Sequence, residues 1–209
     1  MKENRLAQFG NIPVSASMIS SLYPGIKAKN NKVSELEKAG DIIRLKRGLY
    51  VVSHELTDKV FSTELMANHI YAPSYISTLS ALRIYGLIPE TVCAMQSMTI
   101  KHSRNFENQF GRFEYTSISR DAFPVGLRMM EDSGVSVIIA SPEKALCDLV
   151  ANTPMLTLRY KRDVVRYLED DIRFDMDALQ NMDLQIFREY ISVGKKPQSI
   201  NTIIKFISQ

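Results

Sequence analysis

The chain has 209 residues, of which 45% are hydrophobic and 23% are charged, a balance that favours a folded globular protein over a disordered or fibrous one. It has no apolar run near the roughly 20 residues of a membrane-spanning helix, and its polar first residues do not resemble a secretion signal, so we expect a cytoplasmic protein. The two cysteines, Cys93 and Cys147, form no CxxC pair, which argues against a disulfide framework or a zinc site.

The net charge of +3 is small, but it is unevenly distributed along the chain. Residues 1–52 contain nine Lys or Arg and four Asp or Glu, a net charge of +5, whereas residues 53–209 have a net charge of −2. A basic excess in one short terminal segment is typical of an appended nucleic-acid-binding module.

The first forty residues predict three short helices. The first is a patch at Leu6–Phe9. Ser15 or Ser17 can cap the second, which ends at Pro24-Gly25 and buries Met18, Ile19 and Leu22. The third runs from about Lys27 to Ala39, with Gly40 in the position of a C-terminal glycine cap.

The segment 41–52 has the pattern of two paired strands. Ile43 and Leu45 alternate with Arg44 and Lys46, and Arg47-Gly48 forms a two-residue turn before the chain returns. Three helices followed by a basic hairpin predict a winged helix-turn-helix DNA-binding domain over residues 1–54.

The third predicted helix has an apolar side, with Ile26, Val33 and Leu36, and a basic, amide-rich side. Lysines suit phosphates, while Asn and Ser can reach base edges. Two other interpretations stay open, because exposed lysines are commonly only solvated and winged helices also serve as protein-docking modules. The residues that we expect to contact DNA are Lys27, Lys29, Asn30, Asn31, Lys32, Ser34, Arg44, Lys46 and Arg47.

Residues 60–209 predict a larger domain that mixes helices and strands, after a polar linker at His54–Lys59. Ser141-Pro142-Glu143 has the cap, the proline and the acidic residue that favour a helix start. Other helices are expected at Thr63–Tyr71, from Pro73-Ser74 to Gly86, and at Met155–Leu168, Met176–Gln180, Leu184–Val193 and Ile200–Ile207. Strands are expected at Met98–Lys101, Phe110–Ile118 and Val135–Ala140.

The predicted fold class is therefore α+β, with an N-terminal winged helix-turn-helix and a larger mixed domain whose C-terminal part is helical. Arg159, Arg162 and Arg166 recur at helical spacing and would form one basic stripe. This stripe is either an ordinary solvated face or a second surface for a nucleic acid or a partner.

The sequence shows no pattern that we can assign to catalysis. It lacks the Walker A, GxSxG, HExxH and GxGxxG motifs, and its three histidines are scattered at positions 54, 69 and 102. Consecutive residues on a helix point in different directions, so Glu169-Asp170-Asp171 favours a solvated stretch over a metal site. We expect no enzyme, cofactor or metal, and leave open an enzyme that uses Glu143 or Asp171.

Three stretches give the chain a family resemblance: residues 36–50, LEKAGDIIRLKRGLY; residues 73–89, PSYISTLSALRIYGLIP; and residues 140–148, ASPEKALCD. In this order they resemble the AbiEi family of type IV antitoxins, found in abortive-infection loci that defend bacteria against phage. The resemblance implies a winged helix that binds operator DNA and represses its own operon. It also implies DNA contact by Asn31, Lys32, Ser34, Arg44, Lys46 and Arg47, and it places Tyr75, Ser77, Ser80 and Arg83 in the second stretch.

The resemblance further implies a C-terminal domain that counteracts a nucleotidyltransferase toxin without needing a stable complex with it. We therefore expect an antitoxin-type transcriptional repressor on double-stranded operator DNA. We expect the operator to be an inverted repeat with one copy of the chain on each half-site, bound separately or as a homodimer on DNA. The alternative is a protein-interaction module that uses the winged helix for docking without DNA binding.

Overall fold

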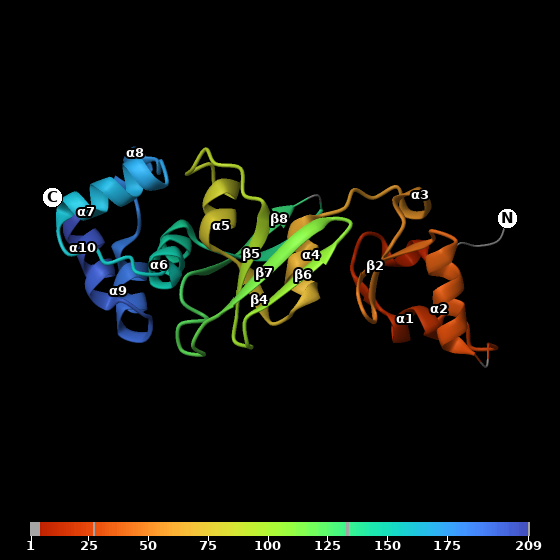
Figure 1. The fold of residues 1–209 in the computed structure, drawn as a ribbon. Coiled ribbons are helices and arrows are strands. Elements are labelled where there is room, and N and C mark those ends of the chain that lie inside the picture. The colour runs from red at the N-terminus through yellow and green to blue at the C-terminus, as the bar shows by residue number, and fades with distance from the viewer. Residues whose placement is uncertain (1–4, 27, 133, 209) are drawn as a thin grey trace.

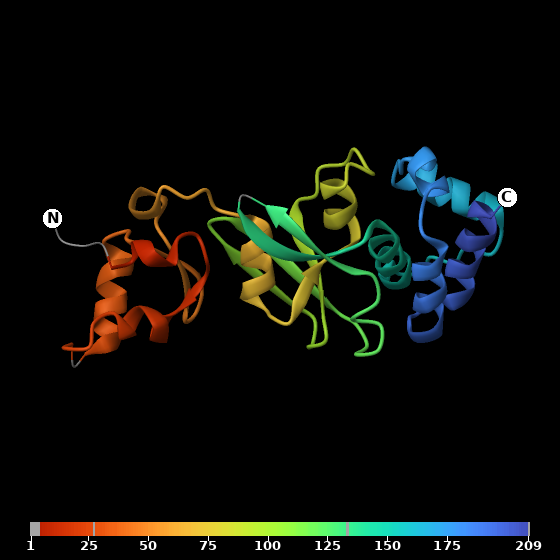
Figure 2. The same cartoon turned by 180° about the vertical axis from the view of Figure 1, so that it is seen from behind.

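The computed structural model describes residues 5–26, 28–132 and 134–208, without the side chains of Lys29 and Asn30. The chain has a mixed α+β fold in three parts that lie in a row (Figures 1 and 2). A small N-terminal part lies at one end, a six-stranded sheet lies in the middle, and a group of helices lies at the other end.

The N-terminal part combines short helices with a three-stranded antiparallel sheet. Its helices are a 3₁₀ turn at Ala7–Phe9, α1 (Ala16–Ser21) and α2 (Lys29–Lys38). Its strands have the order β1 (Val14–Ser15), β3 (Leu49–Val52) and β2 (Ile42–Lys46). These elements enclose a hydrophobic core that consists of Leu6, Val14, Ile19, Val33, Leu36, Ile42, Tyr50 and Val52.

Two details of this part differ from the sequence prediction. Met18 is 49% exposed, because Ile19 and Ser20 of α1 face the core and Met18 lies about 100° further round the helix. The expected linker at His54–Lys59 contains the short helix α3 (His54–Thr57), whose N-terminus is capped by Ser53 Oγ accepting a hydrogen bond from the backbone N–H of Glu55.

The central sheet has the strand order β6-β7-β5-β4-β9-β8. The pairs β4–β9 and β5–β7 are parallel and the other pairs are antiparallel. The bounds of the strands are β4 (Ser74–Ile76), β5 (Ala94–Thr99), β6 (Arg104–Asn108), β7 (Gly111–Ser117), β8 (Leu127–Asp132) and β9 (Val135–Ala140).

Helices cover both faces of this sheet: α4 (Thr63–Ile70) on one and α5 (Thr78–Ile84) with α6 (Pro142–Asn152) on the other. Successive residues of β4 point to opposite faces. Ser74 donates a hydrogen bond to the backbone carbonyl of Ala67 in α4, whereas Tyr75 donates to Asp148 in α6. This alternation connects β4 to both helical layers.

The predicted helix from Pro73-Ser74 is wrong in its first turn, which is strand β4, and α5 begins only at Thr78. All three residues of β4 are buried, so the segment lacks the polar alternation that marks a strand with one exposed face. The edge strands β6 and β8 also escape prediction, because β6 is largely polar and β8 lacks a regular alternation of apolar and polar residues.

The C-terminal part contains α7 (Lys161–Val165), a π-helical segment at Arg166–Asp171, α8 (Met176–Gln180), α9 (Leu184–Val193) and α10 (Pro197–Ile207). The predicted helix at Met155–Leu168 is wrong before Lys161. The Asp163 carboxylate accepts hydrogen bonds from the backbone N–H groups of Arg159 and Tyr160, which fixes the helix start. No helix in the described part of the chain is long and apolar enough to cross a membrane.

Candidate nucleic-acid interface

Helix α2 lies on the outer side of the N-terminal part, away from the central sheet (Figure 1). Val33 and Leu36 anchor it in the core, which leaves Asn31 and Ser34 exposed on the opposite side. Lys32 is half-buried: its Nζ lies 3.2 Å from Glu35 Oε2 and 5.5 Å from the centre of the Tyr23 ring. Lys27 and the side chains of Lys29 and Asn30 lie outside the described residues.

The β2–β3 hairpin places Arg47 at its exposed tip. Gly48 follows with a φ of +80°, a backbone conformation that favours glycine and lets the chain turn back tightly. Arg44 points to the flank of α2, where its guanidinium donates to the Glu37 carboxylate and lies 5.8 Å from the centre of the Tyr50 ring. Arg44 therefore connects the hairpin to α2, and its charge is partly balanced by Glu37.

Lys46, which we expected among the DNA-contacting residues, lies at the junction with the central sheet. Its Nζ donates to the backbone carbonyl of Ile70 at the end of α4. The register of β2 against β3 shifts between Arg44 and Lys46, which breaks the simple alternation. Burial lowers the pKa of Lys46, and so do the positive charges of Lys101 and Arg104.

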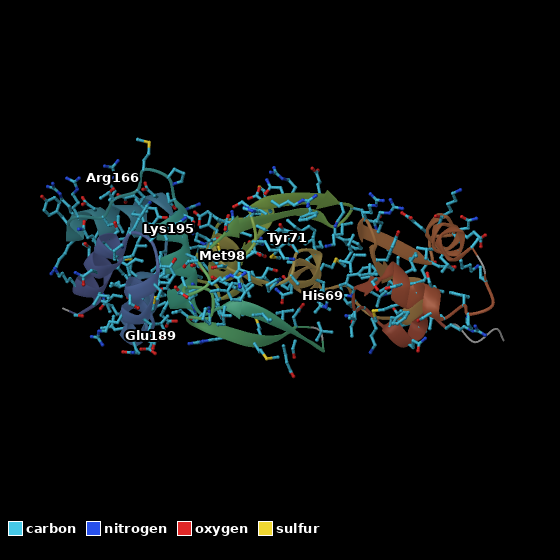
Figure 3. The ribbon with its side chains drawn as sticks, turned by 90° about the horizontal axis from the view of Figure 1, so that it is seen from below. His69, Tyr71, Met98, Arg166, Glu189 and Lys195 are labelled. Atoms are coloured by element: carbon cyan, nitrogen blue, oxygen red, sulfur yellow. The ribbon has the colours of Figure 1, made fainter. Side chains whose placement is uncertain are left out.

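Lys46, Lys101 and Arg104 surround the rings of Tyr71 and Phe106 and form a basic–aromatic cluster; Tyr71 is labelled in Figure 3. The Lys101 Nζ lies 5.1 Å from the centre of the Tyr71 ring, and the Arg104 guanidinium lies 5.0 Å from that of Phe106. Three separate stretches of the chain contribute to this cluster, around residues 46, 71 and 101–106, so no local sequence pattern predicted it. It extends the positive charge of the hairpin onto the edge of the central sheet.

The three arginines of the predicted stripe do not share one helix. Arg159 precedes α7, Arg162 lies on α7, and Arg166 begins the π-helical segment. All three are exposed, but Figure 3 shows Arg166 at the end of the molecule opposite the N-terminal part. They therefore form no continuous surface with α2 and the hairpin.

A buried polar network joins the second and third stretches of the family resemblance. The Asp148 carboxylate accepts hydrogen bonds from Tyr75 (2.9 Å), Ser77 (2.8 Å) and Tyr190 (3.0 Å). Lys144 Nζ lies 3.1 Å from the same carboxylate, and both side chains are fully buried. Burial raises the pKa of Asp148, which the ammonium of Lys144 opposes. These satisfied contacts indicate a structural network that joins β4, α6 and α9.

The other residues of the second stretch have different surroundings. Ser80 Oγ accepts a hydrogen bond from the backbone N–H of Gln96 and donates to the carbonyl of Ala94, which joins α5 to β5. Arg83 is exposed and, with Glu64, lines a surface hollow. Sequence reasoning therefore found this stretch but not its contacts with Asp148.

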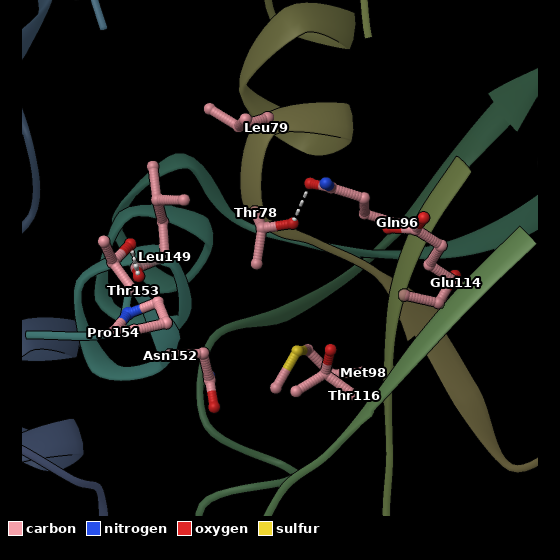
Figure 4. Close-up of a pocket in the computed structure, with 11 residues that line it drawn as sticks. Thr78, Leu79, Gln96, Met98, Glu114, Thr116, Leu149, Asn152, Thr153 and Pro154 are labelled. Carbon is pink, nitrogen blue, oxygen red and sulfur yellow. Dashed lines mark hydrogen bonds between the residues drawn. The ribbon is translucent and has the colours of Figure 1, made fainter. Parts of the chain in front are cut away.

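A cleft of about 220 Å³ lies between the central sheet and the C-terminal end of α6 (Figure 4). Thr78 Oγ1 donates to Gln96 Oε1 at its wall (2.6 Å), and Glu114 is ion-paired with Arg112. Glu143 has a structural role, since its Oε1 accepts a hydrogen bond from the backbone N–H of Asp183. Among the described residues, no group of three or more His, Cys, Asp or Glu is arranged to hold a metal ion.

In comparisons with known proteins, no protein-family model matches the sequence and no curated protein matches it.

Proposed function

We propose that the chain is a DNA-binding transcriptional repressor of the antitoxin type, whose N-terminal part acts as a winged helix-turn-helix. The observation that carries this proposal is that α2 and the β2–β3 hairpin each expose polar or basic side chains in the basic N-terminal part. Asn31 and Ser34 are exposed on α2, and Arg47 is exposed at the hairpin tip. A helix of this kind can enter the major groove while the hairpin contacts the adjacent phosphates.

Local charge refines the contact residues. Asn31 is the residue suited to base edges, and Arg47 and Lys32 are suited to phosphates. Arg44 can contribute at the rim beside Glu37, while Lys46 supports the hairpin from the junction. Autoregulation of its own operon and the counteraction of a nucleotidyltransferase toxin rest on the family resemblance, and we assign the toxin-directed role to the central and C-terminal parts.

A protein-docking role for the same face is the alternative. It is favoured by the two carboxylates on α2, because Glu35 and Glu37 engage Lys32 and Arg44 and reduce the positive charge offered to phosphate. The two roles are distinguished by DNA affinity, because only a DNA-binding face loses affinity for DNA when the charge of Arg47 is removed.

The proposal predicts that the purified full chain binds the DNA upstream of its own gene and that Asn31→Ala and Arg47→Ala weaken this binding in different ways. Asn31→Ala should lose about 1–3 kcal/mol on the specific site and relax discrimination between sequences. Arg47→Ala should weaken specific and unrelated DNA alike. Electrophoretic mobility shift or fluorescence anisotropy measures both effects.

Arg188→Ala is the matched control, since Arg188 is exposed on α9 in the C-terminal part. It removes the same charge and should leave DNA affinity unchanged. Equal affinities of the wild type, Asn31→Ala and Arg47→Ala would contradict the assignment of this face.

A further inference from the structure

The two rims of the central sheet are not equivalent. Beside β6, the Asn108 side chain donates a hydrogen bond to the backbone carbonyl of Leu45, so the N-terminal part supports that rim. At the opposite rim, β8 pairs with β9 on one side and with no other strand of the described chain. Figure 3 shows the β8–β9 hairpin along the lower rim of the molecule.

The orientation of the β8 backbone follows from a contact made by Ile138 in β9. The Asn68 side chain accepts from the Ile138 N–H (2.6 Å) and donates to its carbonyl (3.1 Å), so both groups point away from β8. Ile138 is the register partner of Met129. Because antiparallel pairs alternate, the N–H and C=O groups of Met129 also point away from β9, toward the open edge. The same holds for Leu127 and Glu131.

Two apolar side chains accompany this open edge. Met129 is 75% exposed, and its cross-strand neighbour Ile138 is 42% exposed. The strand also carries charges of both signs, with Arg128 and Glu131 exposed and Asp132 half-exposed. Charges commonly protect an edge strand from association. Here the order of the charges lets the strand pair antiparallel with a second copy of itself, so that opposite charges face each other.

We propose that β8 is a homodimerisation strand that pairs antiparallel with β8 of a second copy of this chain, around a two-fold axis at Met130. In this register Arg128 faces Asp132 of the other copy, and Met129 faces its Glu131. Met129 and Glu131 supply outward backbone groups for the ladder. Arg128 and Asp132 form non-hydrogen-bonded pairs, whose side chains lie closer together and suit an ion pair.

Neighbouring registers are less favourable. A two-fold axis perpendicular to the sheet keeps every side chain on its own face, and it must pass through a residue of the strand. The neighbouring registers therefore have the axis at Met129 or at Glu131. At Met129 it would set Arg128 opposite Met130 and leave no opposite charges face to face. At Glu131 it would set two like charges directly opposite each other, which is destabilising. Charge complementarity therefore selects Met130.

A single strand pair is smaller than the interface of about 1,200 Å² that marks stable complexes, so we expect a weak dimer that forms at micromolar concentration. Sedimentation of the full chain over a concentration series, without DNA, measures it. The absence of DNA makes its failure distinguishable from failure of the proposed repressor function. Wild type should change from the mass of one chain to that of two.

Charge reversal tests the pairing. Arg128→Asp and Asp132→Arg should each remain monomeric, because each sets like charges opposite each other. An equimolar mixture of the two variants should restore the dimer, because every facing pair is then opposite in sign. Matching circular dichroism spectra and melting temperatures show that each variant is folded. A monomeric wild type at the highest concentration, or a mixture that stays monomeric, would overturn the proposal.

Disulfide crosslinking tests the axis independently. In a Cys93→Ser background, which removes the exposed native thiol, Met130→Cys should form an intermolecular disulfide. Met129→Cys should crosslink much less, because residue 129 faces residue 131 of the other copy. Faster crosslinking at 129 than at 130, or none at 130, would overturn the Met130 register.

Discussion

Asp148 shows how this fold tolerates a buried ion pair. Its carboxylate receives hydrogen bonds from Tyr75, Ser77 and Tyr190, and the ammonium of Lys144 faces it at 3.1 Å. Lys144 also donates to the backbone carbonyl of Ala122 (2.8 Å). Buried charges cost little only when they are paired and hydrogen-bonded, and both conditions are met here.

Removing one charge of this pair should lower the unfolding free energy far more than replacing both charges with apolar side chains. Asp148→Asn leaves Lys144 buried without its counter-ion and should lose about 3–5 kcal/mol of unfolding free energy. The double variant Lys144→Met/Asp148→Leu should lose much less than the sum of its single changes. Urea denaturation measures the cycle. Additive losses would show that the two charges are not coupled.

The tyrosines of the network make stability sensitive to alkaline pH. Burial raises the pKa of Tyr75 and Tyr190 above the ordinary value of 10.0, and the Asp148 charge raises both further. Because the pKa of each tyrosine is higher in the folded state, its contribution to the unfolding free energy is fully present below pH 10. This contribution is lost as the pH rises above 10. The unfolding free energy should therefore fall above pH 10, measured by urea denaturation. Tyr75→Phe should flatten this fall, and an equal slope in both proteins would contradict it.

Only some contacts of the buried network could be predicted from the sequence. Lys144 and Asp148 are four residues apart, a spacing that brings side chains together on a helix, so their contact could have been found from the sequence. Tyr75 and Tyr190 join them from 73 and 42 residues away from Asp148, and no local pattern carries that information. The contact of Lys46 with Ile70 was not foreseen for a similar reason, since Ile70 lies on another element.

At the scale of elements, local signals predicted well where they were strong. The prediction of β9 is confirmed at Val135–Ala140, where β-branched residues dominate, and α6 begins where the capping residue Ser141 and the following proline indicated. The predictions of α8 and α9 are also confirmed in their bounds. These elements have clear caps or a continuous apolar face.

Prediction failed where a contact between distant parts of the chain overrides local preference. Strand β4 looks like a helix start because helical spacing continues after it, but Ser74 and Tyr75 are fixed by α4 and α6 on opposite faces of the sheet. The segment before α7 is apolar enough for a helix, yet the Asp163 carboxylate holds the backbone of Arg159 and Tyr160 outside it.

Across the whole molecule, the N-terminal part is tied to the rest through several contacts. Lys46 reaches the end of α4, Asn108 binds the carbonyl of Leu45, and the Asn11 side chain donates to the carbonyl of Val60 (2.8 Å). Leu45 and Val51 are buried in the large core beside the central sheet. DNA bound by α2 would thus be held in a defined orientation relative to the central sheet.

The most direct test of the repressor proposal is the affinity of the full chain for its own upstream DNA at several salt concentrations. We predict that the logarithm of the affinity falls linearly with the logarithm of salt concentration, by about 0.9 for each phosphate contacted, and that Arg47→Ala reduces this slope by about 1. Absence of binding at low salt, or binding that salt does not weaken, would contradict DNA recognition and favour a protein-docking role for this face.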